Sequence, residues 1–205
     1  MNLRNTLLSL LLTIAAGCGV DETGIPQPFP LPKPNTQLLR SSGVAEPDVL
    51  RPVNVVGLPG VVPKAGKIRI DNQGKFVEVQ ATASGSFFAT LEAKGKDVLD
   101  VRFETSEPAE IEVPLLGVQS PRPPGPAPGV PPLEGPTDGV VTVRGQGNTG
   151  VDIFVVNLGS GEIGTGQTQG ADGMFELKVQ AASGDTLRVY EDLQMLLGYW
   201  ELTVP

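Results

Sequence analysis

Residues 171–190 read ADGMFELKVQAASGDTLRVY, and their pattern indicates the fold class. Apolar and polar side chains alternate from Phe175 to Val179 and again from Leu187 to Val189, the period of two that places successive side chains on opposite faces of a β-strand. Asp172-Gly173 precedes the first run and Gly184-Asp185 precedes the second, and both dipeptides favour tight turns. The stretch therefore predicts two half-buried strands joined by a turn.

The same motifs occur once more, 88 residues earlier in the chain. Val-x-Val-x-Gly at 53–57 recurs at 141–145, and two further pairs share that offset: Gly-x-Phe at 85–87 and 173–175, and Asp-x-Leu-x-Val at 97–101 and 185–189. Three motifs in one order at one offset indicate an internal repeat. The middle hairpin does not keep this offset, which predicts a compensating difference in length there.

The remaining segments also have the pattern of short strands. Lys67–Asp71 and Phe76–Gln80 alternate, and the chain closes on a run in which Trp200, Leu202 and Val204 share one face. Such strands, separated by turn signals, are typical of a β-sandwich. We predict an all-β protein of two small sandwiches in which Trp200 belongs to a core.

Proline-rich segments flank the first repeat. Five prolines alternate with other residues from Pro26 to Pro34, and residues 120–129 consist largely of Pro and Gly. Proline fixes φ and cannot donate to a sheet, so the first segment predicts a polyproline II stalk and the second a linker that cannot pair with a strand. The predicted organisation is 1–17 signal peptide, 18–47 stalk, 48–113 first sandwich, 114–137 linker and 138–205 second sandwich.

The amino terminus has the features of a secretory signal. Arg4 precedes the apolar run Leu7–Ala16, which is too short to span a bilayer. The sequence Ala15-Ala16-Gly17-Cys18 resembles the lipobox of bacterial lipoproteins, in which the cysteine is diacylglycerol-modified and becomes the new amino terminus. The resemblance implies that Cys18 anchors the protein to a membrane, and Gly19 in place of Asp implies the outer membrane. An ordinary signal with an incidental cysteine is the alternative.

The two repeats resemble bacterial immunoglobulin-like domains. The resemblance rests on Val141–Gly145, on the Asp-Gly-x-Phe motif at 172–175 and on the Gly-Asp-x-Leu-x-Val motif at 184–189, whereas the first copy has Ser84 in place of the turn aspartate. The prealbumin-like fold of carboxypeptidase regulatory domains shares this pattern and stays open. Neither resemblance implies a catalytic set.

Composition excludes several classes of site. The chain has no His and one Cys, which excludes Ser-His-Asp catalysis, imidazole metal sites, internal disulfides and Cys-x-x-Cys motifs. Its formal net charge of −8 argues against nucleic acid as a partner. Residues 138–205 carry three basic and nine acidic residues, so the second repeat is the more acidic one. We expect no cofactor and no bound metal.

Several side chains remain as candidates for a site. Asp172-Gly173 and Gly184-Asp185 could hold Ca²⁺, although hairpin turns use the same residues. Asp97/Asp100 and Glu191/Asp192 could be paired acids of a glycosidase, but domains this small offer little room for a sugar cleft, and solvated strand faces are the preferred explanation. The basic residues around Lys67, Arg69 and Arg102 are interleaved with acids, which favours a solvated face. The possible ligand contacts are Tyr199, which should point outward, and Phe88.

These observations favour a non-catalytic protein of the bacterial envelope. We expect a spacer, adhesion or assembly component that is tethered by lipid on Cys18 and contacts an envelope protein. The alternative is a carbohydrate-binding surface lipoprotein, which would need Tyr199 and Phe88 exposed together on one concave face.

Overall fold

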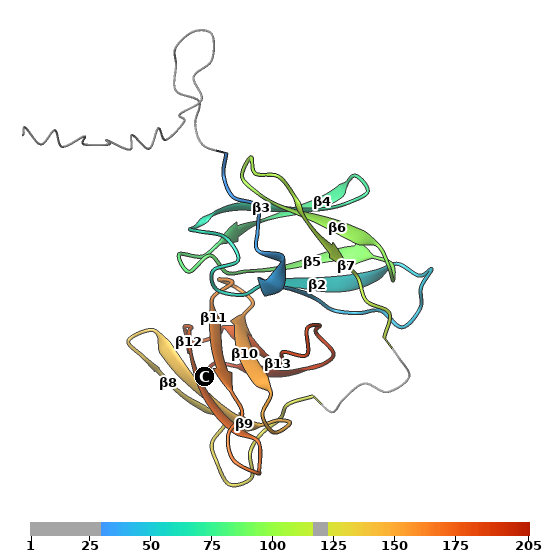
Figure 1. Ribbon diagram of the computed structural model, residues 1–205. Helices are drawn as coiled ribbons and strands as arrows, with labels where there is room; N and C mark the ends of the chain where they lie inside the picture. The colour runs from blue at the N-terminus through green and yellow to red at the C-terminus, as the bar shows by residue number, and fades with distance from the viewer. Residues whose placement is uncertain (1–29, 117–122) are drawn as a thin grey trace, which may run out of the picture. The chain divides into compact units, whose positions relative to one another are not determined.

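The computed structural model describes residues 30–116 and 123–205, and residues 31–205 form one compact unit. Across these ranges the chain forms strands β1 to β14 in four antiparallel sheets, together with a single 3-10 turn, η1, at Thr36–Leu38 (Figure 1). The predicted all-β fold class is confirmed. Among the described residues, none belongs to a helix long and apolar enough to cross a membrane. The predicted signal and Cys18 lie outside the described residues.

The first sandwich consists of two sheets that share one apolar core. Three strands lie in the order β1-β2-β5 and four in the order β4-β3-β6-β7. Side chains from both sheets, such as Val53, Phe87, Ile70 and Val101, pack in the same buried cluster. The strands span β1 Leu39–Ser41, β2 Arg51–Gly57, β3 Gly66–Asn72, β4 Lys75–Ala81, β5 Phe87–Ala93, β6 Val98–Phe103 and β7 Ala109–Glu112.

The second sandwich repeats this arrangement. Its sheets have the orders β8-β9-β12 and β11-β10-β13-β14, so each strand has a counterpart seven strands earlier. Its core includes Val143, Phe175 and Val189, and Trp200 packs against that core while remaining partly exposed. The strands span β8 Leu133–Thr137, β9 Val140–Gln146, β10 Asp152–Asn157, β11 Ile163–Gln167, β12 Met174–Gln180, β13 Thr186–Glu191 and β14 Tyr199–Thr203.

The topology accounts for the repeated sequence motifs. Gly57 pairs with Phe87 across β2 and β5, and Gly145 pairs with Phe175 across β9 and β12. A Cβ atom at either glycine would overlap the ring of the phenylalanine opposite, so the ring and the glycine have to occur together. In each copy the fourth strand joins the sheet of the third, sixth and seventh strands.

A third apolar cluster joins the two sandwiches along a surface that we call the seam. It comprises side chains on the outer faces of sheets β1-β2-β5 and β11-β10-β13-β14 and in the loops beside them: Val56, Leu58, Phe154, Val156, Tyr190 and Leu196. At its edge Arg40 donates from Nε to Asp192 Oδ1 over 2.5 Å and from a terminal nitrogen to Oδ2 over 2.8 Å. Ser86 Oγ donates to the carbonyl of Gly161 over 2.9 Å. The sequence pattern did not predict this contact.

Two strands lie outside the predicted sandwich boundaries. β1 falls within the range predicted as stalk and β8 within the range predicted as linker. β1 begins after the first proline-rich segment ends at Pro34. β8 follows Pro132 and contains Pro136, and its register with β9 shifts between Glu134 and Thr137. A fragment that contains the whole folded unit therefore starts at Leu31, whose side chain packs against the first core.

The expectation that residues 120–129 cannot pair with a strand was wrong at one position. Gly125 donates its N–H to the carbonyl of Gln146 over 3.0 Å and accepts the N–H of Gln146 over 2.8 Å. Glycine retains the N–H that its proline neighbours lack, so a single pair of hydrogen bonds forms within an otherwise unpaired segment.

Gly173 offers a test of the repeat turn. Its φ of +64° is a left-handed conformation, and a Cβ atom there would overlap the carbonyl oxygen of Gly147. We expect Gly173→Val to lower the free energy of unfolding by more than about 3 kcal/mol, because the strained backbone alone costs about 1–3 kcal/mol. Gly184→Val is the matched control, since Gly184 has a φ of +89° with no atom within 4 Å of the added Cβ. Urea unfolding of residues 31–205 measures both, and equal losses would contradict the predicted overlap.

Candidate functional site

A cleft of about 410 Å³ opens at the seam and receives side chains from both sandwiches. The first sandwich contributes hydroxyl and amide groups from β2, β5 and the segment after β1. The second contributes an arginine and two tyrosines from β13 and β14. The polar and aromatic lining residues are Ser42, Asn54, Thr90, Arg188, Tyr190 and Tyr199.

Arg188 lies between the two aromatic residues that the sequence offered as ligand contacts. Its guanidinium carbon is 4.3 Å from the ring centroid of Tyr199 and 6.0 Å from that of Phe88. Its Nε donates to Glu201 Oε2 over 2.9 Å. Tyr199 is 44% exposed, whereas Phe88 is partly buried against the seam and does not line the cleft. The structure therefore brings the two predicted residues together and leaves Tyr199 as the accessible one.

Tyr190 forms the inner wall of the cleft. Only 1% of the residue is exposed, and its ring stacks on Phe154 with centroids 5.3 Å apart. Burial raises the pKa of Tyr190 to about 12, so the hydroxyl keeps its proton at physiological pH. Within the described ranges this hydroxyl has no hydrogen-bond partner. A buried donor without a partner costs about 1–3 kcal/mol, so this hydroxyl weakens the seam and is not open to a ligand in the cleft.

Sequence analysis missed both Arg188 and Tyr190 as site residues. Both point to the outer face of β13, on the side opposite the core residues Leu187 and Val189. The signal that could have found them is the apolar run Ile153–Val156 on β10, because a strand that is apolar at consecutive positions is covered on both faces. Covering that outer face is what creates the seam and its cleft.

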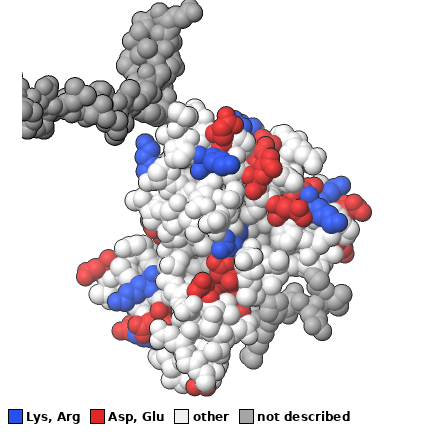
Figure 2. All heavy atoms as spheres, in the orientation of Figure 1, with Lys and Arg blue, Asp and Glu red and all other residues white. Residues whose placement is uncertain are grey.

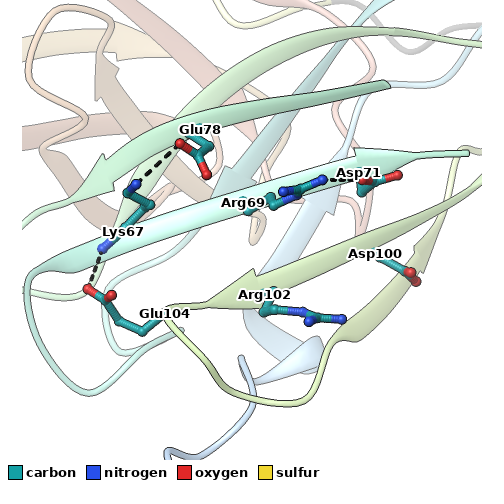
Figure 3. Close-up of a pocket in the computed structure, with 7 residues that line it drawn as sticks. All are labelled: Lys67, Arg69, Asp71, Glu78, Asp100, Arg102 and Glu104. Carbon is teal, nitrogen blue, oxygen red and sulfur yellow. Dashed lines mark hydrogen bonds and ion pairs between the residues drawn. The ribbon is translucent and has the colours of Figure 1, made fainter. Parts of the chain in front are cut away.

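A second hollow, of about 430 Å³, lies on the outer face of sheet β4-β3-β6-β7 (Figure 3). Lys67 Nζ lies 3.3 Å from Glu78 Oε2, and an Arg69 terminal nitrogen donates to Asp71 Oδ2 over 3.0 Å. The N–H of Gly74 and the Arg69 guanidinium lower the pKa of Asp71 below its ordinary value of 3.8. The side chains that line the hollow are Lys67, Arg69, Asp71, Glu78, Asp100, Arg102 and Glu104. Its basic and acidic groups are interleaved, as the solvated-face interpretation expected.

The candidate acids hold turns and loops of the fold. Asp97 Oδ2 accepts from Asn72 Nδ2 over 3.0 Å and from the N–H of Lys94 over 2.8 Å. Asp185 Oδ2 makes the equivalent bonds, with Asn157 Nδ2 over 2.7 Å and the N–H of Ala182 over 2.8 Å. These bonds support the turn interpretation of Gly184-Asp185 over the Ca²⁺ interpretation.

The other candidate acids, Glu191 and Asp192, make two separate contacts. Buried Glu191 accepts from the N–H and from Nδ2 of Asn148, both over 2.6 Å, while Asp192 pairs with Arg40 across the seam. Residues 30–116 and 123–205 contain no group of three or more acidic, His or Cys side chains placed to hold a metal ion.

Comparisons with known proteins find similarity among solved structures. No family model and no curated protein matches the chain. Among the solved structures that match is a chain from work on host cell surface retention of a 1.5-MDa bacterial ice-binding adhesin. The two are 13% identical with a TM-score of 0.25, and the match covers 81% of this chain and 62% of the adhesin chain, which is less than two thirds of its length.

The Asn157–Asp185 contact predicts a pH dependence of stability. The N–H of Ala182 and the amide of Asn157 lower the pKa of Asp185 below its ordinary value of 3.8. A carboxylate whose folded pKa is depressed stabilises the fold above its unfolded pKa, and this contribution is lost as the pH falls through the folded pKa. We expect the difference in unfolding free energy between the native chain and Asp185→Asn to shrink on acidification below about pH 4.

Two measurements check this. Urea unfolding as a function of pH gives the free-energy difference, and carbon-detected NMR titration gives the pKa of the carboxyl directly. Asn157→Ser removes one donor and should move the pKa of Asp185 upward. A difference that is constant from neutral to acidic pH would contradict the structural role assigned to this carboxylate.

Proposed function

We propose that this chain is a non-catalytic module of the bacterial cell envelope, tethered by lipid on Cys18 and acting as a spacer, adhesion or assembly component. The folded unit would contact a partner protein of the envelope while the lipid holds it at the membrane. The outer membrane is the proposed destination because Gly19 follows the cysteine.

The observation that carries this proposal is the seam. It makes two sandwiches one compact unit, so the cleft and the outer faces keep fixed positions relative to each other. A surface fixed in advance loses less conformational entropy when it binds. The candidate acids support a non-catalytic role, because Asp97, Asp185 and Glu191 are engaged in hydrogen bonds that hold the fold.

The tether would be short. Thirteen positions separate Cys18 from Leu31, where the folded unit begins, and at about 3.1 Å per residue they reach at most about 40 Å. The predicted stalk to residue 47 would have reached about 90 Å at the same rise. The proposed role is therefore contact close to the membrane surface.

Saccharide binding is the second candidate function, with Tyr199 alone of the two expected aromatic contacts exposed at the cleft. The cleft presents the exposed ring of Tyr199 for stacking and the Arg188 guanidinium, close to the polar groups of Asn54 and Thr90. A neutral sugar suits this set better than an acidic one, because Glu201 already neutralises Arg188 and the surrounding sandwich is acidic.

Cys18→Ser tests the tether. We expect the variant to leave the membrane fraction and to lose incorporation of labelled palmitate, because a hydroxyl does not replace the thiol that carries the diacylglycerol. Ser9→Ala, a small change in the apolar leader that keeps the cysteine, should leave both readouts unchanged. Membrane retention of the unlabelled Cys18→Ser protein would contradict lipid anchoring.

Tyr199→Ala tests the cleft as a sugar site. Titration calorimetry with maltohexaose and cellohexaose measures binding to residues 31–205, and the substitution should weaken it about tenfold, or about 1.4 kcal/mol. Phe76→Ala is the matched control, because Phe76 is also an exposed ring beside an arginine, 3.7 Å from the Arg69 guanidinium. Equal weakening in both variants, or no binding of either sugar, would count against saccharide recognition at the seam.

A further inference from the structure

The two sandwiches can be compared position by position, because their topology and locking contacts coincide. Asn72 at the end of β3 bonds Asp97, and Asn157 at the end of β10 bonds Asp185. These contacts align β3 with β10 and β6 with β13. The outer face of sheet β4-β3-β6-β7 therefore corresponds to the outer face of β11-β10-β13-β14, which is half of the seam.

The corresponding positions carry opposite chemistry. Phe154, Val156 and Tyr190 are buried in the seam. Their counterparts in the first sandwich are Arg69, Asp71 and Arg102, which line the charged hollow. Figure 3 shows these three charged side chains on the outer face of β3 and β6. The same face of the same fold is thus a docking surface in one copy and a charged surface in the other.

The other half of the seam shows the same exchange. Val56 and Phe88 on the outer face of β2 and β5 lie at the seam. The registers β2–β5 and β9–β12 align them with Arg144 and Glu176 in the second sandwich. Arg144 Nε donates to Glu176 Oε2 over 2.7 Å, and its guanidinium also pairs with Glu134 over 2.5 Å.

Each sandwich therefore has two outer faces. One packs in the seam, and the other is charged although its counterpart in the other copy packs in the seam. We call the outer faces of β4-β3-β6-β7 and β8-β9-β12 the two end faces. If the end faces were apolar like their counterparts, the β4-β3-β6-β7 face of one molecule could pack against the β8-β9-β12 face of another. The contact would then repeat the one that the two sandwiches make in the seam. Stacking of that kind does not close on itself and would continue from molecule to molecule.

Free-energy magnitudes decide whether the end faces can stack as they are. Burying an apolar side chain stabilises an interface by about 1.5–3 kcal/mol. Burying an ion costs several kcal/mol, which mutual attraction recovers only where the geometry is excellent. Stacking would bury Arg69, Asp71 and Arg102 against Arg144 and Glu176, groups that already have internal ion pairs or exposed positions.

We infer that the two end faces are charged caps that limit the stack to two sandwiches and keep copies of this chain apart. Acidic and basic side chains lie close together over the upper part of the unit in Figure 2, where Figure 1 draws β3, β4 and β6. Terminal faces that are polar serve the same purpose in repeat proteins, whose inner faces are apolar.

The test uses the fragment of residues 31–205 and places the residue types of the seam at the equivalent positions of the end faces. One variant carries Arg69→Phe, Asp71→Val and Arg102→Tyr, and a second carries Arg144→Val and Glu176→Phe. Sedimentation velocity of the native fragment should show a monomer, and the mixture of the two variants should form a 1:1 complex. A chain carrying all five substitutions should form a head-to-tail series of increasing size.

The controls separate stacking from unspecific association. A third variant with Arg69→Gln, Asp71→Asn and Arg102→Gln removes charge without adding apolar surface, and it should not bind the second variant. Near-ultraviolet circular dichroism confirms that each variant is folded. If the triple apolar variant does not fold, Arg69→Phe with Arg102→Tyr replaces it in the mixture.

Two results would overturn the inference. The first is a mixture of folded variants without a complex, because the end faces would then not be equivalent to the seam. The second is a native fragment that associates through these faces and becomes monomeric on Arg144→Val and Glu176→Phe, because the charges would then join copies instead of separating them.

Discussion

One apolar cluster, buried between the two sandwiches, fixes their relative position and creates the cleft. Its buried side chains, among them Val56, Phe154 and Tyr190, lie outside both sandwich cores. At about 1.5–3 kcal/mol for each buried side chain, six of them are enough to make the contact a lasting one within a single chain. The ion pair between Arg40 and Asp192 at the edge of the cluster fixes the relative orientation of the sandwiches more than it stabilises them. Its two planar groups, joined by two hydrogen bonds, fit in only one arrangement.

The cleft follows from that contact. Thr90 belongs to the first sandwich and Arg188 and Tyr199 to the second, so the lining of the cleft is complete only while the seam is closed. The turn that carries Gly161 also depends on close approach, since this glycine has a φ of +75° and its carbonyl accepts from Ser86 of the other sandwich. Binding at the cleft and cohesion of the two sandwiches are therefore thermodynamically linked, because a ligand that contacts both sides stabilises the closed seam.

The fold could be predicted from sequence because the inner positions of the strands obey a simple rule. Alternation identified β12 and β13, and the offset of 88 residues correctly paired Phe87 with Phe175 and Asp97 with Asp185. The middle hairpin departs from that offset, as Asn72 and Asn157 show. The short strand β1 escaped prediction because it has three residues and follows a proline-rich segment, and a pattern of period two needs a longer run to be visible.

The candidate site was predicted only in part, for a related reason. Tyr199 was correctly placed outside the core, because its neighbour Trp200 packs inward. Nothing in the sequence indicates which outer face meets which, because outer residues are chosen by a partner surface and not by the strand itself. Within β10 the consecutive apolar residues Phe154 and Val155 show that a partner exists, yet they do not identify it.

Comparison of the two copies separates what the fold requires from what each surface does. The inner residues Val53 and Val141 are identical, and so are the turn glycines Gly85 and Gly173, because the packing of a sandwich and the geometry of its turn leave few substitutes. The outer residues at equivalent places differ in kind, as Arg102 and Tyr190 do. An outer position is free to follow its surroundings, so the change from charged to apolar marks the boundary between surface that meets water and surface that meets protein. By this criterion the cleft is the place where both kinds of surface meet, and a ligand there would find stacking and hydrogen bonding within one site.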